Sequence, residues 1–217
     1  MTANEVIALA RVGELSKLSI AIKDDNTVLF GFINLGLVEL YKRFPLKNDE
    51  AIVTLRDGKT IYKLDGTDPD VSMGEPFMYL LGAYEDGTDN DFSASALSLP
   101  INEEDNIYSV NSISYNSIQI PLVTTGAYIS LIYVAKPTKV TALTLNEELD
   151  LPDQMIEALL HYIGYRAHGA MDANIQTESN THYMRFEASC NKLKELGVGI
   201  APDDVSMNSR ISMKGFV

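Results

Sequence analysis

The sequence of 217 residues contains one cysteine, no tryptophan and only three histidines. A single cysteine, Cys190, excludes a disulfide framework within the chain and fits assembly in a reducing cytoplasm. Because Cys190 lies within a helical pattern of apolar residues, we expect a small core residue rather than a reactive thiol. Basic residues are also few, since 17 Lys and Arg stand against 30 Asp and Glu, a formal net charge of −13. This balance argues against wrapping nucleic acid through phosphate contacts, but it allows DNA to slide past, because like charges repel.

Long apolar runs and a signal sequence are missing as well. The longest apolar run, residues 28–38, is interrupted by Asn34 and is too short to cross a bilayer. Residues 1–19 lack the basic-then-apolar pattern of a signal peptide. We therefore expect no membrane insertion. With 46% hydrophobic and 22% charged residues, the composition is that of a globular protein with a sizeable core.

Signatures of catalysis and metal binding are absent from the sequence. No serine is framed by glycines, and no glycine-rich loop ends in Lys-Ser or Lys-Thr. His161 and His168 are seven residues apart and His182 lies on a later helical stretch, so zinc ligands three or four apart on one helix are not present. We predict no enzymatic activity, no cofactor and no metal, and we expect the histidines to be hydrogen-bonded packing residues.

Helical periodicity is strongest near the C-terminal end of the chain. In Leu151–Ala170, apolar residues recur at steps of three and four and so share one side of a helix, with Pro152 at the expected first helical position. A second helix is expected at Thr181–Leu196, ended by Gly197. One apolar stripe cannot be buried alone, so other helices must cover it. The residues of the first stripe are Met155, Ile156, Leu159, Leu160, Ile163, Ala167 and Ala170.

The N-terminal segment supplies two further helices. Thr2 and Glu5 have the spacing of a capping box, which predicts a helix to about residues 13–16. Thr27–Phe44 is apolar nearly all round, which is typical of a central helix. Gly31 and Gly36 lower its helix propensity and indicate close approach by a neighbour.

Between these helical ends the period changes to that of strands. Ala51–Leu55 and Thr60–Leu64 flank Asp57-Gly58, a pair that predicts a hairpin between two β-prone runs. We expect five or six short antiparallel strands in all. The others lie at Phe77–Tyr84, at Ser112–Tyr115 and Ile118–Ile120 around a second hairpin turn, and at Tyr128–Val134.

We predict an α+β fold with a helical bundle built from the N- and C-terminal helices, an inserted antiparallel β unit and an extended C-terminal tail. The expected domains are residues 1–48 plus 145–197 for the bundle, 49–144 for the β domain and 198–217 for the tail. The first helices are too apolar for one covering surface, so they should pack with the C-terminal pair. The tail has no helical period and is expected to fray or to become ordered against a partner.

Negative charge gathers in the predicted β domain. Eleven acidic residues and no Lys or Arg lie between Leu64 and Val110. A solvated loop face, an anion-repelling channel lining and a calcium-binding loop are the three interpretations. Residues 86–91 offer oxygen ligands for calcium but lack the ordered spacing of an EF-hand. The residues expected to face a channel or solvent are Asp86, Asp89, Asp91, Glu103, Glu104 and Asp105.

The order of features from Tyr128 to Ala170 is recognisable. A strand ends in Leu131-Ile-Tyr-Val-Ala-Lys-Pro137, a short linker follows, and an acidic Leu149-Asp-Leu-Pro152 opens the helix from Met155 to Ala167. This order resembles the head-to-tail adaptor (connector) proteins of tailed phages. Residues 105–121 resemble the β insert of that family, in which a short hairpin ends in proline, and the other helices also fall where the family has them.

The resemblance implies a structural protein of a short-tailed phage virion. Such an adaptor is located in the neck, assembles in the host cytoplasm and forms a ring, expected to hold twelve copies, between the portal protein and the tail nozzle protein. DNA passes through the centre of the ring during ejection and is a partner only as this passing strand, not as a bound ligand. The C-terminal segment of the family grips the portal, which implies portal contacts for Ile200, Pro202, Val205, Met207, Ile211, Met213, Phe216 and Val217.

Two alternatives remain open at this point. The strand-rich insert is compatible with another phage structural protein, such as a tail-fibre or capsid-decorating protein, although no internal repeat is visible. An enzyme or small-ligand binder would use His161, His168 and the acidic residues, and only missing motifs argue against it.

Overall fold

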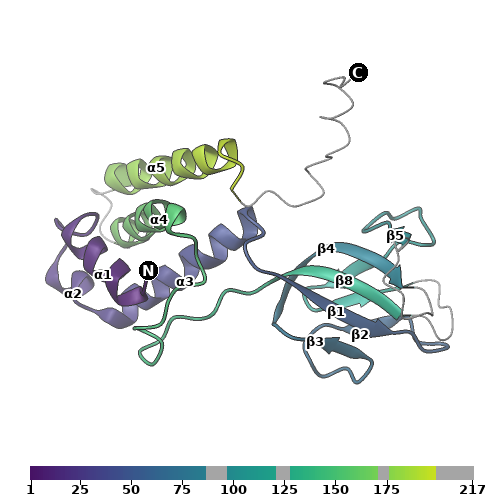
Figure 1. The fold of residues 1–217 in the computed structure, drawn as a ribbon. Coiled ribbons are helices and arrows are strands. Elements are labelled where there is room, and N and C mark those ends of the chain that lie inside the picture. Colours follow the sequence, from purple (N-terminus) through teal and green to yellow (C-terminus); the bar gives the residue numbers. More distant parts are fainter. Residues whose placement is uncertain (87–96, 121–127, 171–175, 199–217) are drawn as a thin grey trace, which may run out of the picture. The chain divides into compact units, whose positions relative to one another are not determined.

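The computed structural model describes residues 1–86, 97–120, 128–170 and 176–198. The chain divides into two compact units (Figure 1), one formed by Met1–Leu46 with Pro137–Val217 and the other by Lys47–Lys136. The first unit contains the helices and the second contains antiparallel sheets. The prediction of an α+β protein with antiparallel strands is confirmed, whereas the predicted tail, apart from its first residue Val198, falls outside the described residues.

Local capping signals set the ends of the helices in the first unit. Thr2 and Glu5 form the predicted capping box, in which Thr2 Oγ1 accepts the N–H of Glu5 at 3.3 Å and Glu5 Oε2 accepts the N–H of Thr2 at 2.8 Å. Asp25 Oδ1 accepts the N–H groups of Thr27 and Val28 and so caps the longest N-terminal helix. The described helices are α1 (Ala3–Val12), α2 (Ile20–Lys23), α3 (Asn26–Arg43), the 3₁₀ helix η1 (Asp153–Met155), α4 (Ile156–Gly169) and α5 (Gln176–Glu195).

The two C-terminal helices begin at other residues than the sequence predicts. Pro152 precedes η1 with an extended ψ of 141°, so the chain enters α4 through a 3₁₀ turn and not directly at Leu151. Helix α5 begins five residues before the predicted Thr181. Its end is as expected, because Gly197 adopts a φ of 75° and Val198 N–H reaches the carbonyl of Leu193 at 3.0 Å, a Schellman motif.

Helix α4 lies among α1, α3 and α5 (Figure 1), and one apolar core draws on all four helices. The approach of α3 to α4 is closest at Gly36, where an added Cβ would lie 2.5 Å from Leu159 Cδ1 and 3.1 Å from Tyr162 Cδ1. At Gly31 an added Cβ would meet nothing within 4 Å. The inference that glycine marks a close neighbour is therefore correct for Gly36 and wrong for Gly31.

The chain returns to the helical unit at Pro137, before residue 145, where the sequence suggests the boundary. Val140 is buried in the helical core, and its backbone exchanges two hydrogen bonds with Asn34. Asn34 Nδ2 donates to the Val140 carbonyl at 2.9 Å, and Asn34 Oδ1 accepts the Val140 N–H at 2.8 Å. The polar residue that interrupts the apolar run of α3 thus fastens the returning segment to that helix.

Two sheets enclose one core in the second unit. The five-stranded sheet has the order β3-β1-β8-β4-β5, the three-stranded sheet has the order β2-β7-β6, and the strand pairs are antiparallel. Inward-facing residues of both sheets form the core, among them Leu131 and Tyr133 of β8, which are fully buried. The described strands are β1 (Asn48–Thr54), β2 (Ile61–Lys63), β3 (Val71–Met73), β4 (Phe77–Asp86), β5 (Leu97–Leu99), β6 (Asn111–Ser114), β7 (Ser117–Gln119) and β8 (Tyr128–Ala135).

The hairpin predicted around Asp57-Gly58 is wrong, whereas the second predicted hairpin is confirmed. A turn does form at the first position, since Lys59 N–H donates to the Arg56 carbonyl at 3.1 Å and Gly58 has a φ of 74°. The strands on either side nevertheless enter different sheets, because β1 pairs with β3 and β8 while β2 pairs with β7. The Asp57-Gly58 pair therefore predicts the chain reversal correctly, but the strands that β1 and β2 pair with are decided by burial against distant strands. Strands β6 and β7 pair as predicted, and β3 and β5 are additional to the prediction.

Candidate functional site

The predicted acidic surface is partly described. Glu103, Glu104 and Asp105 are exposed on the loop that follows β5. Asp86 ends β4 opposite Tyr128, but its side chain lies outside the described part of the chain. Asp89 and Asp91 also fall outside it, and so do the eight residues predicted to contact the portal. Those eight are Ile200, Pro202, Val205, Met207, Ile211, Met213, Phe216 and Val217.

The loop carrying the three exposed acidic residues is held by its own hydrogen bonds. Asn106 Nδ2 donates to Glu103 Oε2 at 2.9 Å, and the N–H of Glu103 donates to Ser109 Oγ at 2.9 Å. Ile107 and Tyr108, beside the carboxylates, are 64% and 56% exposed. The loop therefore presents two exposed apolar side chains beside its three carboxylates.

Other acidic residues of the same stretch stabilise the β unit. Asp70 is buried and pairs with Arg56 and Lys59, and Asp68 accepts from Lys59 Nζ at 2.5 Å. Burial opposes ionisation of Asp68, but the hydrogen bond from Lys59 and two backbone N–H groups lower its pKa below the ordinary value. Glu75 forms an ion pair with Lys47 at 3.1 Å. The stretch that looks uniformly acidic in sequence is thus partly neutralised by basic residues from outside it.

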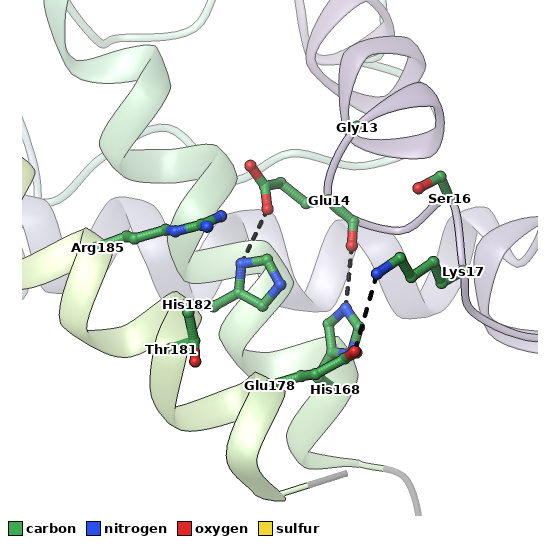
Figure 2. A pocket seen from close by; sticks show the side chains of 9 residues that line it. All are labelled: Gly13, Glu14, Ser16, Lys17, His168, Glu178, Thr181, His182 and Arg185. Atoms are coloured by element: carbon green, nitrogen blue, oxygen red, sulfur yellow. Dashed lines mark hydrogen bonds and ion pairs between the residues drawn. The ribbon is translucent and has the colours of Figure 1, made fainter.

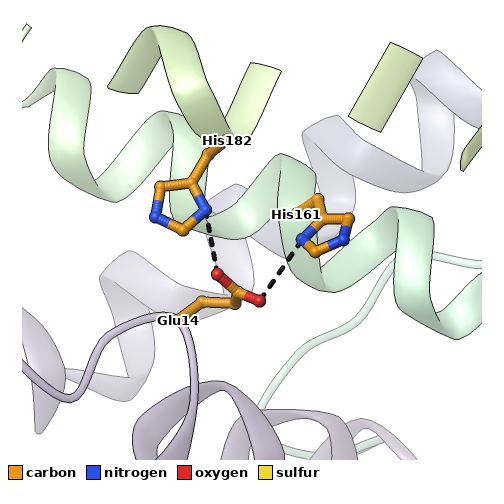
Figure 3. A group of neighbouring side chains, drawn as sticks. All are labelled: Glu14, His161 and His182. Carbon is orange, nitrogen blue, oxygen red and sulfur yellow. Dashed lines mark ion pairs between the residues drawn. The ribbon is translucent and has the colours of Figure 1, made fainter. Parts of the chain in front are cut away.

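All three histidines of the chain meet at Glu14, in the turn that follows α1. His182 Nδ1 of α5 lies 2.8 Å from Glu14 Oε2, and His161 Nδ1 of α4 lies 3.3 Å from Glu14 Oε1 (Figure 3). His168 Nε2 lies 3.0 Å from the Glu14 carbonyl oxygen, which only accepts, so this nitrogen carries a proton. The His168 and His182 rings are stacked with centroids 4.7 Å apart. The cluster ties one turn and two helices together.

A pocket of about 290 Å³ opens beside this cluster (Figure 2). His168, which is 2% exposed, and His182 line it together with Glu14. Glu178 also lines the pocket, and its Oε2 lies 3.2 Å from His168 Nδ1. Burial lowers the pKa of His182, and the charge of Glu14 opposes that effect only in part. The remaining lining residues are Gly13, Ser16, Lys17, Thr181 and Arg185.

The expectation that the histidines are hydrogen-bonded packing residues did not include their convergence on Glu14. The spacing of His161 and His168 on one helix gives no signal, because the shared partner Glu14 comes from a turn far away in the sequence. The donor atoms of Glu14, His161 and His182 lie within 4.8 Å of one another, close enough to serve one metal ion. Cys190, by contrast, is a buried core residue whose pKa is raised by burial, as expected.

Comparison with known proteins gives the family. Within the described ranges, none of the helices combines the length and apolar character that a bilayer crossing requires. No match to a curated protein was found. A family model described as SU10 adaptor protein matches residues 1–210, nearly the whole chain. This match agrees with the resemblance to phage head-to-tail adaptors on residues 128–170, and the chain belongs to the SU10 adaptor protein family.

Proposed function

We propose that the chain is a head-to-tail adaptor that forms a ring between the portal and the tail nozzle, with DNA passing through the centre. The observation that carries this proposal is the family match over residues 1–210, which supports a structural role as a phage adaptor protein. A neck component of this kind binds portal and tail proteins. A ring of twelve copies would match a twelvefold portal.

The charge of the chain supports a passage for DNA. With 14 acidic and five basic residues, the β unit has a net charge of −9 of the total −13. A lining of this sign repels the phosphate backbone, so DNA slides without binding. We infer that Glu103, Glu104 and Asp105, with Asp86, Asp89 and Asp91, face either the channel or solvent around it.

Binding to the portal protein of the same phage tests the proposed function. The adaptor should co-sediment with assembled portal, and particles reconstituted from the two proteins should show a ring of extra density below the portal by electron microscopy. Unmixed adaptor should remain monomeric or weakly associated. The proposal fails if the chain does not bind the portal and the neck of the virion contains no density for it.

The C-terminal segment Val198–Val217 is the proposed portal grip. Its deletion should abolish co-sedimentation with the portal while the circular dichroism spectrum of the remaining chain keeps its helical content. Substituting the three loop acids Glu103, Glu104 and Asp105 by Gln provides the control, because portal binding should survive it. Attachment that persists without Val198–Val217 would remove the grip from the proposal and leave the adaptor role in place.

A further inference from the structure

We propose that Glu14, His161 and His182 bind a divalent transition-metal ion, with Zn²⁺ as the best fit, which cross-links the turn after α1 to α4 and α5. This site is independent of the proposed adaptor role. Two imidazole nitrogens and one carboxylate form a common three-ligand set for zinc. The neighbouring pocket leaves room for water as a fourth ligand.

The distances suit one shared ion. The carboxylate oxygens of Glu14 lie 2.8 Å from His182 Nδ1 and 3.3 Å from His161 Nδ1. Ligand atoms about 2.0–2.1 Å from a tetrahedral zinc are separated by about 3.3 Å. Since the three donor atoms lie within 4.8 Å of one another, the His161–His182 edge needs to close by at most about 1.5 Å.

The nitrogens facing Glu14 lack hydrogen-bond partners. His161 Nδ1 and His182 Nδ1 are both buried without one, although a Glu14 oxygen lies close to each of them. The carboxylate is therefore near these nitrogens but outside the direction in which a ring N–H would point. A buried polar atom left this way costs free energy, and an ion between the three groups removes that cost.

Residues around Glu14, His161 and His182 position these three side chains. Glu157 Oε1 lies 3.8 Å from His161 Nε2, too far for a hydrogen bond but close enough for its negative charge to act on this ring. An added Cβ at Gly164 would lie 2.9 Å from His182 Nδ1, so only glycine lets this ring sit against α4. His168 fixes the Glu14 backbone through its Nε2. Neutral imidazoles and carboxylates select borderline metals such as Zn²⁺ over Ca²⁺ and Mg²⁺, which prefer oxygen ligands.

The local charge also admits a divalent cation. Lys17 and Arg185 line the pocket and oppose a metal ion, while Glu157 and Glu178 balance these two charges. With both ligand imidazoles neutral, the carboxylate of Glu14 leaves one net negative charge at the site. Zn²⁺ therefore enters an environment that is slightly negative and not positive.

Titration of the chelator-treated full chain with ZnCl₂ tests the proposal. Isothermal calorimetry should give one Zn²⁺ per chain and a raised thermal midpoint for the helical unit. Glu14→Gln and His161→Gln should each weaken Zn²⁺ binding at least tenfold. Glu178→Gln makes the same chemical change in the same pocket and should leave the affinity within about threefold. Equal affinities in all four proteins, or no stoichiometric binding by the unaltered chain, would overturn the assignment.

Histidine NMR decides the matter without any substitution. The chain has three histidines, so the ring ¹⁵N signals can be assigned individually. Adding Zn²⁺ should move the Nδ1 signals of His161 and His182 to the range of metal-bound nitrogen and leave His168 nearly unchanged. If no ring nitrogen shifts, or if only His168 shifts, the proposed site does not exist.

Discussion

At the scale of single residues, Gly36 and Gly31 lie in the same helix but differ in how much room surrounds an added side chain. Alanine gains up to about 1 kcal/mol of helix propensity at either position. At Gly36 a methyl group would press on the buried side chains of Leu159 and Tyr162, and such overpacking costs about 1–3 kcal/mol. Gly36→Ala should therefore destabilise the helical unit by about 1 kcal/mol, whereas Gly31→Ala should stabilise it by about 0.5–1 kcal/mol. Urea unfolding followed by circular dichroism at 222 nm measures both, and stabilisation by Gly36→Ala would contradict the close packing of α3 on α4.

The ion pair between Glu187 and Arg43 predicts how the stability of the helical unit changes at low pH. Arg43 Nη1 donates to Glu187 Oε2 at 2.8 Å, which lowers the pKa of Glu187 although partial burial acts in the opposite direction. Because the folded pKa lies below the unfolded value, the stabilisation is fully present above about pH 4.3 and is lost as the pH falls through the folded pKa.

The expected result for Glu187→Gln follows from the lowered pKa of Glu187 in the folded chain. The variant should be less stable than the unaltered chain at pH 7, by no more than about 1 kcal/mol because Glu187 is partly exposed. The difference should shrink toward zero as the pH is lowered below 4, which urea unfolding at a series of pH values measures. Glu195→Gln, at the exposed end of the same helix, should show a difference near zero throughout. A Glu187→Gln effect that grows in acid would refute the ion pair.

At the scale of elements, helix ends follow from short-range chemistry. The capping box at Thr2, the Asp25 cap and the left-handed Gly197 need only neighbours in sequence, so the pattern alone is sufficient to predict them. Predicting which strands pair requires information beyond neighbouring residues. Ala51 of β1 lies opposite Leu131 of β8, and no local signal identifies a partner that far along the chain.

The histidine cluster could not be predicted for the same reason. Spacing rules detect ligands that share one helix face, whereas His161 and His182 lie on two helices and Glu14 lies in a distant turn. Only tertiary packing brings them together. The adaptor family, in contrast, is visible in the order of elements from Tyr128 to Ala170, because that order is a property of the sequence itself.

Asn34 gives a prediction for the connection between α3 and the returning segment. Replacing it by Ala removes both hydrogen bonds to Val140 and leaves a buried N–H and a buried C=O without their partner. Asn34→Ala should destabilise the helical unit by about 2–3 kcal/mol and speed hydrogen exchange of the Val140 amide. Leu35→Ala, at an exposed position next to it, should change the stability by no more than about 0.5 kcal/mol. Unchanged exchange at Val140 in the Asn34 variant would show that the segment is held by other contacts.

At the scale of the whole molecule, the two cores share no residue. The helical core gathers Leu37, Leu159 and Phe186 among others, and the β core gathers Val53, Ile118 and Leu131 among others. Compact units with separate cores can open independently, since the free energy of local opening depends on the contacts within each unit. The chain passes between the units at residues 46–47 and 136–137.

A crossed pair of core variants tests this independence in the intact chain. Leu131→Ala leaves a cavity in the β core, with a cost of about 2–5 kcal/mol, and Gly36→Ala strains the helical core. Hydrogen exchange should speed up in residues 47–136 for the first variant and in the helices for the second, with each variant leaving the other unit within about twofold of the unaltered chain. If either substitution speeds exchange equally in both units, the chain unfolds as one cooperative body. In the proposed adaptor role the chain contacts both a portal and a tail protein, and two independently stable units would let one surface adjust to its partner without weakening the other.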